Sequence, residues 1–291
     1  MVDPDAGVVM DRVPIEVEHG APGAHRELTG AVRTPGGLLL QAAHTEVLWI
    51  DPETFSVVRR VTHPRMHGVH SAAPGPAGTV VLTCAGTDTV LVLDRTGALR
   101  SEHYLGPQGG DARFRGLADL RLCDHDAFKP HAVHPNHAAW VGDDLWVTRF
   151  EDRRCSSLTT QRVIPLAEGI PHDGRLRDGL MWFTQVQGRV IGVDPVTLQR
   201  RVELDLAALT GERRMLGWCR GVEVCGDRLF VGFTMLRRTR HREVLRQVWR
   251  GLRGRKLPTR VMEIDRRTHE VVRQIELGTA AGGTIYAINA V

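Results

Sequence analysis

Apolar and polar positions along the chain repeat in a fixed order. A short apolar run is followed, after a turn, by a second apolar run that ends in aspartate, and then by a third, weaker run. Runs of this length, bounded by turn residues, are typical of buried β-strands. Four copies occur, with the first two runs at 38–40 and 47–51, 80–82 and 90–94, 181–183 and 190–194, and 229–231 and 261–265. A fifth copy begins at 145–148, where Cys155–Leu158 replaces the aspartate-ended run.

This repeat predicts an all-β fold in a single domain, residues 1–291. Tandem units of about 40 to 50 residues, each built of short antiparallel strands, are typical of a β-propeller, and five copies predict five blades. Residues 283–291 alternate like a strand but have no complete unit around them. We expect this segment to join the first blade, so that the N- and C-terminal segments pair and close the ring, because closure removes exposed sheet edges.

The blade pattern resembles the broad propeller families that include lactonase-like, strictosidine-synthase-like and quinoprotein-like proteins. The resemblance covers most of the chain and rests on the repeated strands, not on a catalytic motif of one family. It implies hydrolysis, lyase chemistry or binding without catalysis. A shared fold does not choose among these functions, so the residues must be weighed individually.

A four-residue phrase with two histidines occurs twice, as His67–His70 and as His131–His134, and Pro171–Asp173 repeats it loosely. His70, His134 and His172 each lie nine to eleven residues before the apolar run of their unit. The three histidines therefore occupy nearly equivalent positions in their blades. Equivalent positions on blades related by rotation point toward a common axis, so we expect the three side chains to converge in the central pocket.

Three imidazoles at one point are typical ligands of a divalent transition metal, here Fe, Mn, Zn, Cu or Ni. The spacing does not choose among these metals. Two alternatives remain open. Without a metal, the histidines would bind an anionic substrate or act as acid and base, and as structural residues they would cap turns or join neighbouring blades.

Other polar residues near the repeated phrases are expected to line the pocket or to orient the ligands. Residues three apart on a regular strand face opposite ways, so His67 and His70 cannot both point at the axis. Pro135 interrupts the strand register in the second phrase and allows two of its histidines to converge. The expected pocket residues are His67, His131, Asn136, His137 and Asp173.

Arg220 takes the position equivalent to the histidines in the last unit, and Glu223 follows it closely. We predict catalytic roles for both: Arg220 would clamp a carboxylate or phosphate, and Glu223 would act as a base, a fourth ligand or a partner of an imidazole. The structural alternatives are a salt bridge between blades for Arg220 and a solvated surface position for Glu223.

The net charge of +4 is concentrated in one segment. Residues 236–260 hold nine arginines and Lys256 against Glu243, a local charge of +9, so the rest of the chain carries −5. Apolar residues between Arg240 and Arg253 share one helical face, which predicts an amphipathic helix inserted in the last blade. The helix would pack on the propeller, cover the pocket, or contact an acidic partner or an anionic surface. Trp249 is the one aromatic residue in the segment, which argues against nucleic-acid binding.

No apolar run reaches membrane-spanning length, and the N-terminus is acidic where a signal peptide would be basic. These features predict a cytoplasmic protein. Five cysteines, with no Cys-x-x-Cys pair, favour neither a disulfide framework nor a thiolate zinc site.

Together the patterns predict a metal-dependent enzyme that acts on a small molecule in a histidine-lined pocket. Zinc or manganese would favour hydrolase or lyase chemistry, whereas iron or copper would favour oxidative chemistry. The alternative is a non-catalytic propeller that uses its arginine-rich helix as an interaction platform.

Overall fold

The computed structural model describes residues 1–3, 5–19, 27–212, 214–235, 257–277 and 284–290. The chain forms two compact units. Unit 1 comprises Met1–Arg12 and Arg177–Ala290, and unit 2 comprises Val13–Leu176. The predicted helix of the basic segment lies within 236–256, outside the described residues.

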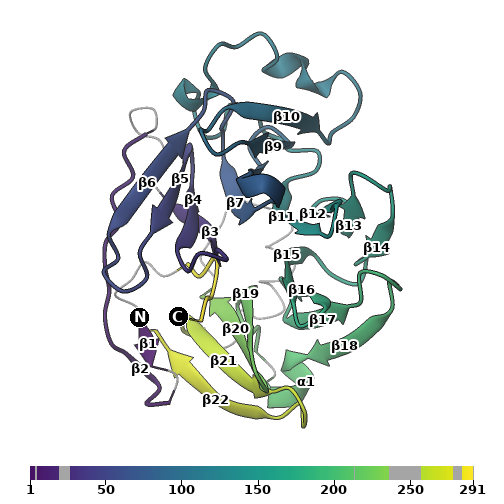
Figure 1. The fold of residues 1–291 in the computed structure, drawn as a ribbon. Coiled ribbons are helices and arrows are strands. Elements are labelled where there is room, and N and C mark those ends of the chain that lie inside the picture. The colour runs from purple at the N-terminus through teal and green to yellow at the C-terminus, as the bar shows by residue number, and fades with distance from the viewer. Residues whose placement is uncertain (4, 20–26, 213, 236–256, 278–283, 291) are drawn as a thin grey trace. The chain divides into compact units, whose positions relative to one another are not determined.

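The chain is a five-bladed all-β propeller, as the repeat predicts. Each blade is a four-stranded antiparallel sheet of four strands consecutive in the chain, coloured in Figure 1 from purple at β3 to yellow at β22. The blades in chain order are β3 to β6, β7 to β10, β11 to β14, β15 to β18 and β19 to β22.

The strand bounds follow the apolar runs closely. In unit 2 they are β3 Leu28–Arg33, β4 Leu39–Ala43, β5 Glu46–Ile50, β6 Val57–Thr62, β7 Val69–Pro74, β8 Val80–Cys84, β9 Thr89–Leu93, β10 Leu99–Tyr104, β11 Pro135–Val141, β12 Asp144–Arg149, β13 Arg154–Ser157 and β14 Val163–Pro165. Strand β15, Pro171–Arg177, ends where unit 1 begins. The later elements are β16 Leu180–Gln185, β17 Arg189–Val193, β18 Arg200–Asp205, α1 Leu206–Thr210, β19 Trp218–Cys225, β20 Arg228–Thr234, β21 Arg260–Asp265 and β22 Val271–Glu276.

The apolar pattern identifies the second and third strands of each blade and misses the first one. The missed strands are β3, β7, β11, β15 and β19; His70 lies in β7, His172 lies in β15, and His134 directly precedes β11. Their sequences mix small and polar residues with apolar ones, as in Ser71-Ala72-Ala73 of β7. The histidines therefore lie in or directly before strands, not in loops ahead of them.

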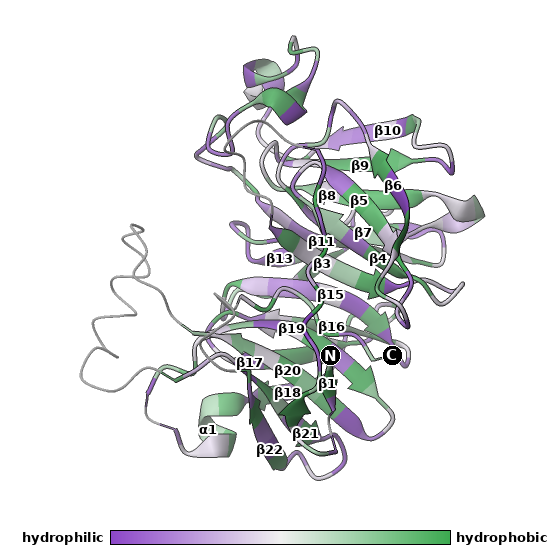
Figure 2. Ribbon diagram, turned by 90° about the vertical axis from the view of Figure 1, so that its left-hand side faces the viewer, coloured by the Kyte–Doolittle hydropathy of each residue, from purple (hydrophilic) through white to green (hydrophobic). Residues whose placement is uncertain are grey.

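The core of each blade lies on its central strands. All residues of β8 and β9 are buried, whereas β10 alternates between exposed and half-buried positions. Figure 2 shows the same contrast, with β9 largely green and β10 partly purple. Leu82 and Leu91 belong to an apolar cluster that also contains Leu40 of the preceding blade. This burial explains why the central strands have the clearest apolar runs.

The aspartate that ends each third strand closes the turn behind it. The Asp94 carboxylate accepts hydrogen bonds from the Thr96 hydroxyl at 2.7 Å and from the backbone N–H groups of Thr96 and Ala98. These bonds, led by that of the Thr96 hydroxyl, lower the pKa of Asp94 to about 2. The same type of turn follows the corresponding strands at Asp51, Asp194 and Asp265.

A 30-residue connection between β10 and β11, residues 105–134, interrupts the regular spacing of the blades. It contains two short 3-10 helices, Gly110–Arg113 and Leu120–Leu122. Phe114, Leu120 and Phe128 form a small buried cluster of its own. The second histidine phrase lies at the end of this connection.

The terminal segments differ from the predicted closure. Within unit 1, β1 (Val2–Asp3) pairs with β2 (Val8–Val9). The C-terminal residues 284–290 form no strand in the described structure and lie against the last blade, where the Ile285 N–H donates to Thr234 Oγ1 at 2.9 Å. Gly232 leaves space for this contact, since a Cβ there would lie 2.7 Å from Ile285. Among the described residues, no helix is long and apolar enough to span a membrane.

Candidate functional site

The first strand of several blades carries a β-bulge at the same place. In β7, Val69 pairs with Cys84 and Ser71 with Thr83 of β8, so the register shifts at His70 between them. In β11, Pro135 and His137 pair with β12 while Asn136 between them is unpaired. A bulge turns the extra side chain away from the regular alternation of the strand, and bulges are common beside active sites. The strand register therefore makes Asn136, and not His134, the equivalent of His70.

Backbone conformation confirms this register. His134 lies directly before β11 with φ of 51°, and Gly68, two residues before His70, has φ of 60°. Both adopt the left-handed conformation one residue before a strand begins. The expectation that His134 is equivalent to His70 is therefore wrong: the equivalent residue is Asn136, two residues after His134. Both strands carry the bulge, so the difference comes from the hairpins: five residues separate the paired Pro74 and Val80, whereas two separate Val141 and Asp144.

His70, His134 and His172 nevertheless lie together in unit 2, and we call them the histidine cluster. The ring centroid of His70 lies 5.4 Å from that of His134 and 5.2 Å from that of His172. Both ring pairs meet edge to face. The ring of His70 is therefore a neighbour of the other two, whereas convergence of all three on one point stays a prediction.

His172, in β15, is the most deeply buried member, with 5% of its surface exposed. Within the described part of the chain, neither of its ring nitrogens has a hydrogen-bond partner. Asp173 Oδ2 lies 3.7 Å from His172 Nδ1, which is beyond hydrogen-bond range. A buried imidazole with two unsatisfied nitrogens needs an explanation, such as an ion or a ligand bound beside it.

His131 extends the cluster on the side of His134. The Nδ1 atoms of the two residues lie 2.8 Å apart, and their rings stack with centroids 5.1 Å apart. One of these nitrogens must carry the proton and donate it to the other. Burial is the main cause that lowers the pKa of His131 to about 4, so His131 is neutral at neutral pH. Because Nδ1 of His134 is engaged in this contact, Nε2 is the ring atom of His134 that would bind a ligand.

The sequence offers no indication of a carboxylate that holds this phrase in place. Asp88, in the turn between β8 and β9, accepts backbone hydrogen bonds from Ala132, Val133 and His134. The two chain segments are more than 40 residues apart, and Asp88 belongs to no repeated motif. A three-dimensional structure was needed to identify this contact.

His67 belongs to a second group of histidines. Its ring centroid lies 5.0 Å from that of His44, which in turn lies 5.0 Å from that of His125. His67 Nε2 donates to the carbonyl oxygen of Asp124 at 3.0 Å, and burial lowers the pKa of His67. His67 and His70 thus lie in different groups, in agreement with the argument that they cannot face the same way. Neither His44 nor His125 was singled out in the sequence.

Asn136 and His137 both lie in β11. Asn136 is buried, and its Nδ2 donates to the carbonyl oxygen of Pro171 at 3.1 Å, which ties β11 to β15 next to His172. Its Oδ1 has no hydrogen-bond partner in the described residues of the chain. His137 pairs with Thr148 in the sheet. Asn136 therefore has a hydrogen-bond acceptor, Oδ1, without a partner among the described residues, and it lies beside β15, the strand of His172.

The predicted catalytic residues of the last blade, Arg220 and Glu223, lie in unit 1. The Arg220 guanidinium lies 4.5 Å from the ring centroid of Tyr286 and 5.3 Å from that of Trp218. Glu223 is buried and forms an ion pair with Arg177, with Oε1 to Nε at 3.1 Å. Glu223 is therefore not a solvated surface group, and its catalytic role stays a prediction.

No group of three or more His, Cys, Asp or Glu side chains among the described residues is arranged as it stands to hold a metal ion. The rings of the histidine cluster are close, but their nitrogens do not meet at one point in this arrangement.

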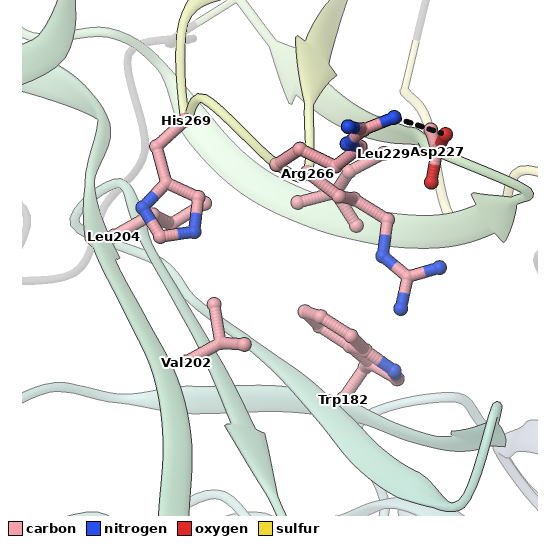
Figure 3. A pocket seen from close by; sticks show the side chains of 8 residues that line it. Trp182, Val202, Leu204, Asp227, Leu229, Arg266 and His269 are labelled. Atoms are coloured by element: carbon pink, nitrogen blue, oxygen red, sulfur yellow. Dashed lines mark ion pairs between the residues drawn. The ribbon is translucent and has the colours of Figure 1, made fainter.

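A surface pocket occurs within unit 1 and is unrelated to any predicted site residue. Figure 3 shows Trp182, Arg266 and His269 around it. Arg266 is already paired with Asp178 at 2.6 Å, and Arg267 with Asp227 at 3.7 Å. Both arginines of this pocket are therefore already held in ion pairs.

No protein-family model matches the sequence, and no curated protein matches it. A solved structure of a protein of unknown function from Bacteroides caccae is similar, with a TM-score of 0.64 and 14% identity over 98% of this chain and 92% of that one. Virginiamycin B lyase from Staphylococcus aureus has a TM-score of 0.54 and 12% identity, over 87% and 71%. Its catalytically inactive histidine-to-alanine variant with quinupristin has a TM-score of 0.51 and 13% identity, over 87% and 70%. At these sequence identities, the comparisons show that the proteins share a fold.

Proposed function

We propose that the protein is an enzyme that acts on a small molecule at the histidine cluster. The observation that carries this proposal is His172, whose two ring nitrogens are buried without a hydrogen-bond partner among the described residues, beside the ring of His70. Structural histidines inside a fold satisfy at least one nitrogen, because an unsatisfied buried polar atom costs about 1–3 kcal/mol. A bound ligand would remove this cost.

The cofactor that we propose is one divalent transition metal, with His70, His134 and His172 as its ligands. Neutral imidazoles suit such metals, and the ring spacing of 5.2–5.4 Å leaves room for an ion after modest rotation of the side chains. A metal held by three histidines has open positions, where it would polarise a substrate oxygen or activate a bound water.

The surrounding residues would orient these ligands and the substrate. A metal-bound histidine usually holds a hydrogen bond with its other ring nitrogen, and His131 offers that partner to His134 Nδ1. Asn136 holds β11 against β15 through its hydrogen bond to Pro171. Its Oδ1, which has no hydrogen-bond partner among the described residues, lies beside the strand of His172. The substrate would donate a hydrogen bond to this oxygen.

Among reaction classes, we propose a lyase first and metal-assisted hydrolysis second. Virginiamycin B lyase has a similar fold, and its inactive variant replaces a histidine. A lyase breaks a bond without adding water, so the products together have the mass of the substrate, whereas hydrolysis adds the mass of one water. Mass spectrometry of the products distinguishes the two.

A second candidate has no metal: the histidines would move protons directly. The present arrangement of the nitrogens favours it, because no three described side chains converge on one point. His172 has a nitrogen free to accept a proton and another free to donate one. Metal content, measured as described at the end of the Discussion, separates the two candidates.

The proposed activity is tested with the full chain, with and without added metal, on a set of probes that contains quinupristin and simple lactones and esters. Turnover should fall by about 100-fold or more in His172→Ala. The matched control is His103→Ala, which removes an exposed histidine from β10 of the same unit. Turnover that is equal in wild type and His172→Ala would contradict the proposal.

A further inference from the structure

The carboxylate of Asp88 is surrounded by backbone donors. Asp88 is 1% exposed. Its Oδ2 accepts from Ala132 N at 2.7 Å, and its Oδ1 accepts from Val133 N at 3.1 Å and from His134 N at 2.7 Å. Three consecutive N–H groups that point at one carboxylate form an anion-binding site filled by the protein itself. Hydrogen bonds to a charged acceptor are the strong ones, so this contact fixes the backbone of the phrase.

This fixation matters because His134 adopts an unusual backbone conformation. Its φ is 51°, a region that residues other than glycine rarely enter and that costs about 1 kcal/mol or more. The corresponding position before β7 is Gly68, which adopts the same conformation without strain. A histidine at this position therefore needs a contact that stabilises the left-handed conformation, and the hydrogen bonds to Asp88 supply it.

We infer that Asp88 is a positioning residue for His134. Its hydrogen bonds are to the backbone of 132–134, and it acts by holding the left-handed turn that aims the imidazole at His70 and His131. If the hydrogen bonds to the Asp88 carboxylate were lost, the His134 backbone would relax toward negative φ. The ring would then leave both neighbours, which now lie 5.4 and 5.1 Å away between ring centroids.

The variants follow from the geometry of Asp88 itself. Asp88 has φ of 55°, so Asp88→Gly removes the carboxylate without backbone strain. Asp88→Asn keeps Oδ1, the acceptor of Val133 and His134, and loses Oδ2, the acceptor of Ala132. The matched control is Asp94→Ala, which removes another carboxylate that accepts backbone hydrogen bonds from a turn of the same blade.

The first readout is the histidine ring spectrum of the full chain, recorded by long-range ¹H–¹⁵N NMR. In Asp88→Gly we expect the His134 ring signals to shift and the His131–His134 ring contact to disappear. Formate, which can occupy the vacated carboxylate site, should restore both. Asp88→Asn should lie between wild type and Asp88→Gly, and Asp94→Ala should match wild type. This readout needs no substrate.

The second readout is turnover, and it rests on the proposed function. We expect kcat to fall by about 10- to 100-fold in Asp88→Gly with KM changed less than about threefold, and formate to recover part of it. Wild-type signals for His134 in a folded Asp88→Gly would overturn the inference. So would a shift that formate does not reverse. A wild type with no activity on any probe would count against the proposed function alone, since the spectra would still decide the role of Asp88.

Discussion

The Nδ1 atoms of His131 and His134 lie 2.8 Å apart, and this contact joins the two histidines of one repeated phrase. Only one of the two nitrogens can carry a proton, so the pair fixes the tautomers of both rings. Because His131 stays neutral, the contact is present throughout the neutral pH range.

Replacement of His131 by phenylalanine keeps a flat ring and removes this hydrogen bond. We expect metal affinity to fall by about 10- to 100-fold, because the imidazole of His134 loses the partner that orients it. Competition titration with Zn²⁺ measures the change. His103→Phe serves as the control, and an unchanged affinity in His131→Phe would show that His134 needs no partner.

Asn136→Asp tests the connection between β11 and β15. The substitution removes the Nδ2 donor to Pro171 and places a carboxylate oxygen against a carbonyl oxygen. At neutral pH we expect the free energy of unfolding to fall by about 1–3 kcal/mol. Part of the loss should be recovered at low pH, where the introduced carboxyl is protonated and can donate. Chemical denaturation measures both effects, and Gln161→Glu, at an exposed amide, should cost much less.

Gly86→Ala tests the packing of the second histidine group. A Cβ at Gly86 would lie 2.1 Å from His67 Nδ1, so the ring or the backbone would have to move. We expect a loss of about 1–3 kcal/mol in the free energy of unfolding. Gly116→Ala, whose Cβ would have no neighbour within 4 Å in the described structure, should leave stability nearly unchanged. Equal stabilities for the two variants would contradict the described position of His67.

The stability of the protein should fall as the solution becomes mildly acidic. Burial lowers the pKa of His67 from its ordinary value of 6.5, so the unfolded chain takes up a proton at a higher pH than the folded chain does. The stabilisation is therefore complete above about pH 6.5 and is lost progressively as the pH falls below that value. Denaturation curves between pH 7.5 and 5 should show this slope, and His67→Gln should reduce it. A slope identical in both proteins would exclude His67 as its source.

The five blades were predictable because the buried central strands repeat in apolar runs that end in aspartate. The first strands were missed because their small and polar residues, such as those of β7, have no apolar run. The proximity of His70 to His134 and to His172 agrees with the sequence spacing, whereas convergence of all three on one point stays a prediction. The equivalence of His134 and His70 did not hold, since the hairpin after β7 has five residues between the paired Pro74 and Val80, whereas the hairpin after β11 has two between Val141 and Asp144.

Asp88 and the second histidine group could not be predicted. The contact of Asp88 with the His131–His134 phrase depends on a 30-residue connection that folds back on the preceding blade. His44 and His125 come from a turn and from that connection, and neither belongs to a repeated phrase. Contacts of this kind depend on tertiary packing and leave no local pattern.

The measurement that tests the account most directly is elemental analysis of the protein purified without an affinity tag. Wild type is compared with His70→Ala, His134→Ala and His172→Ala, and with His103→Ala as the control. We predict close to one equivalent of a single transition metal in wild type and His103→Ala, and loss of the metal in the other three variants with folding preserved. A wild type that is empty and that also fails to take up added Fe, Mn, Zn, Cu or Ni would contradict the proposed metal site.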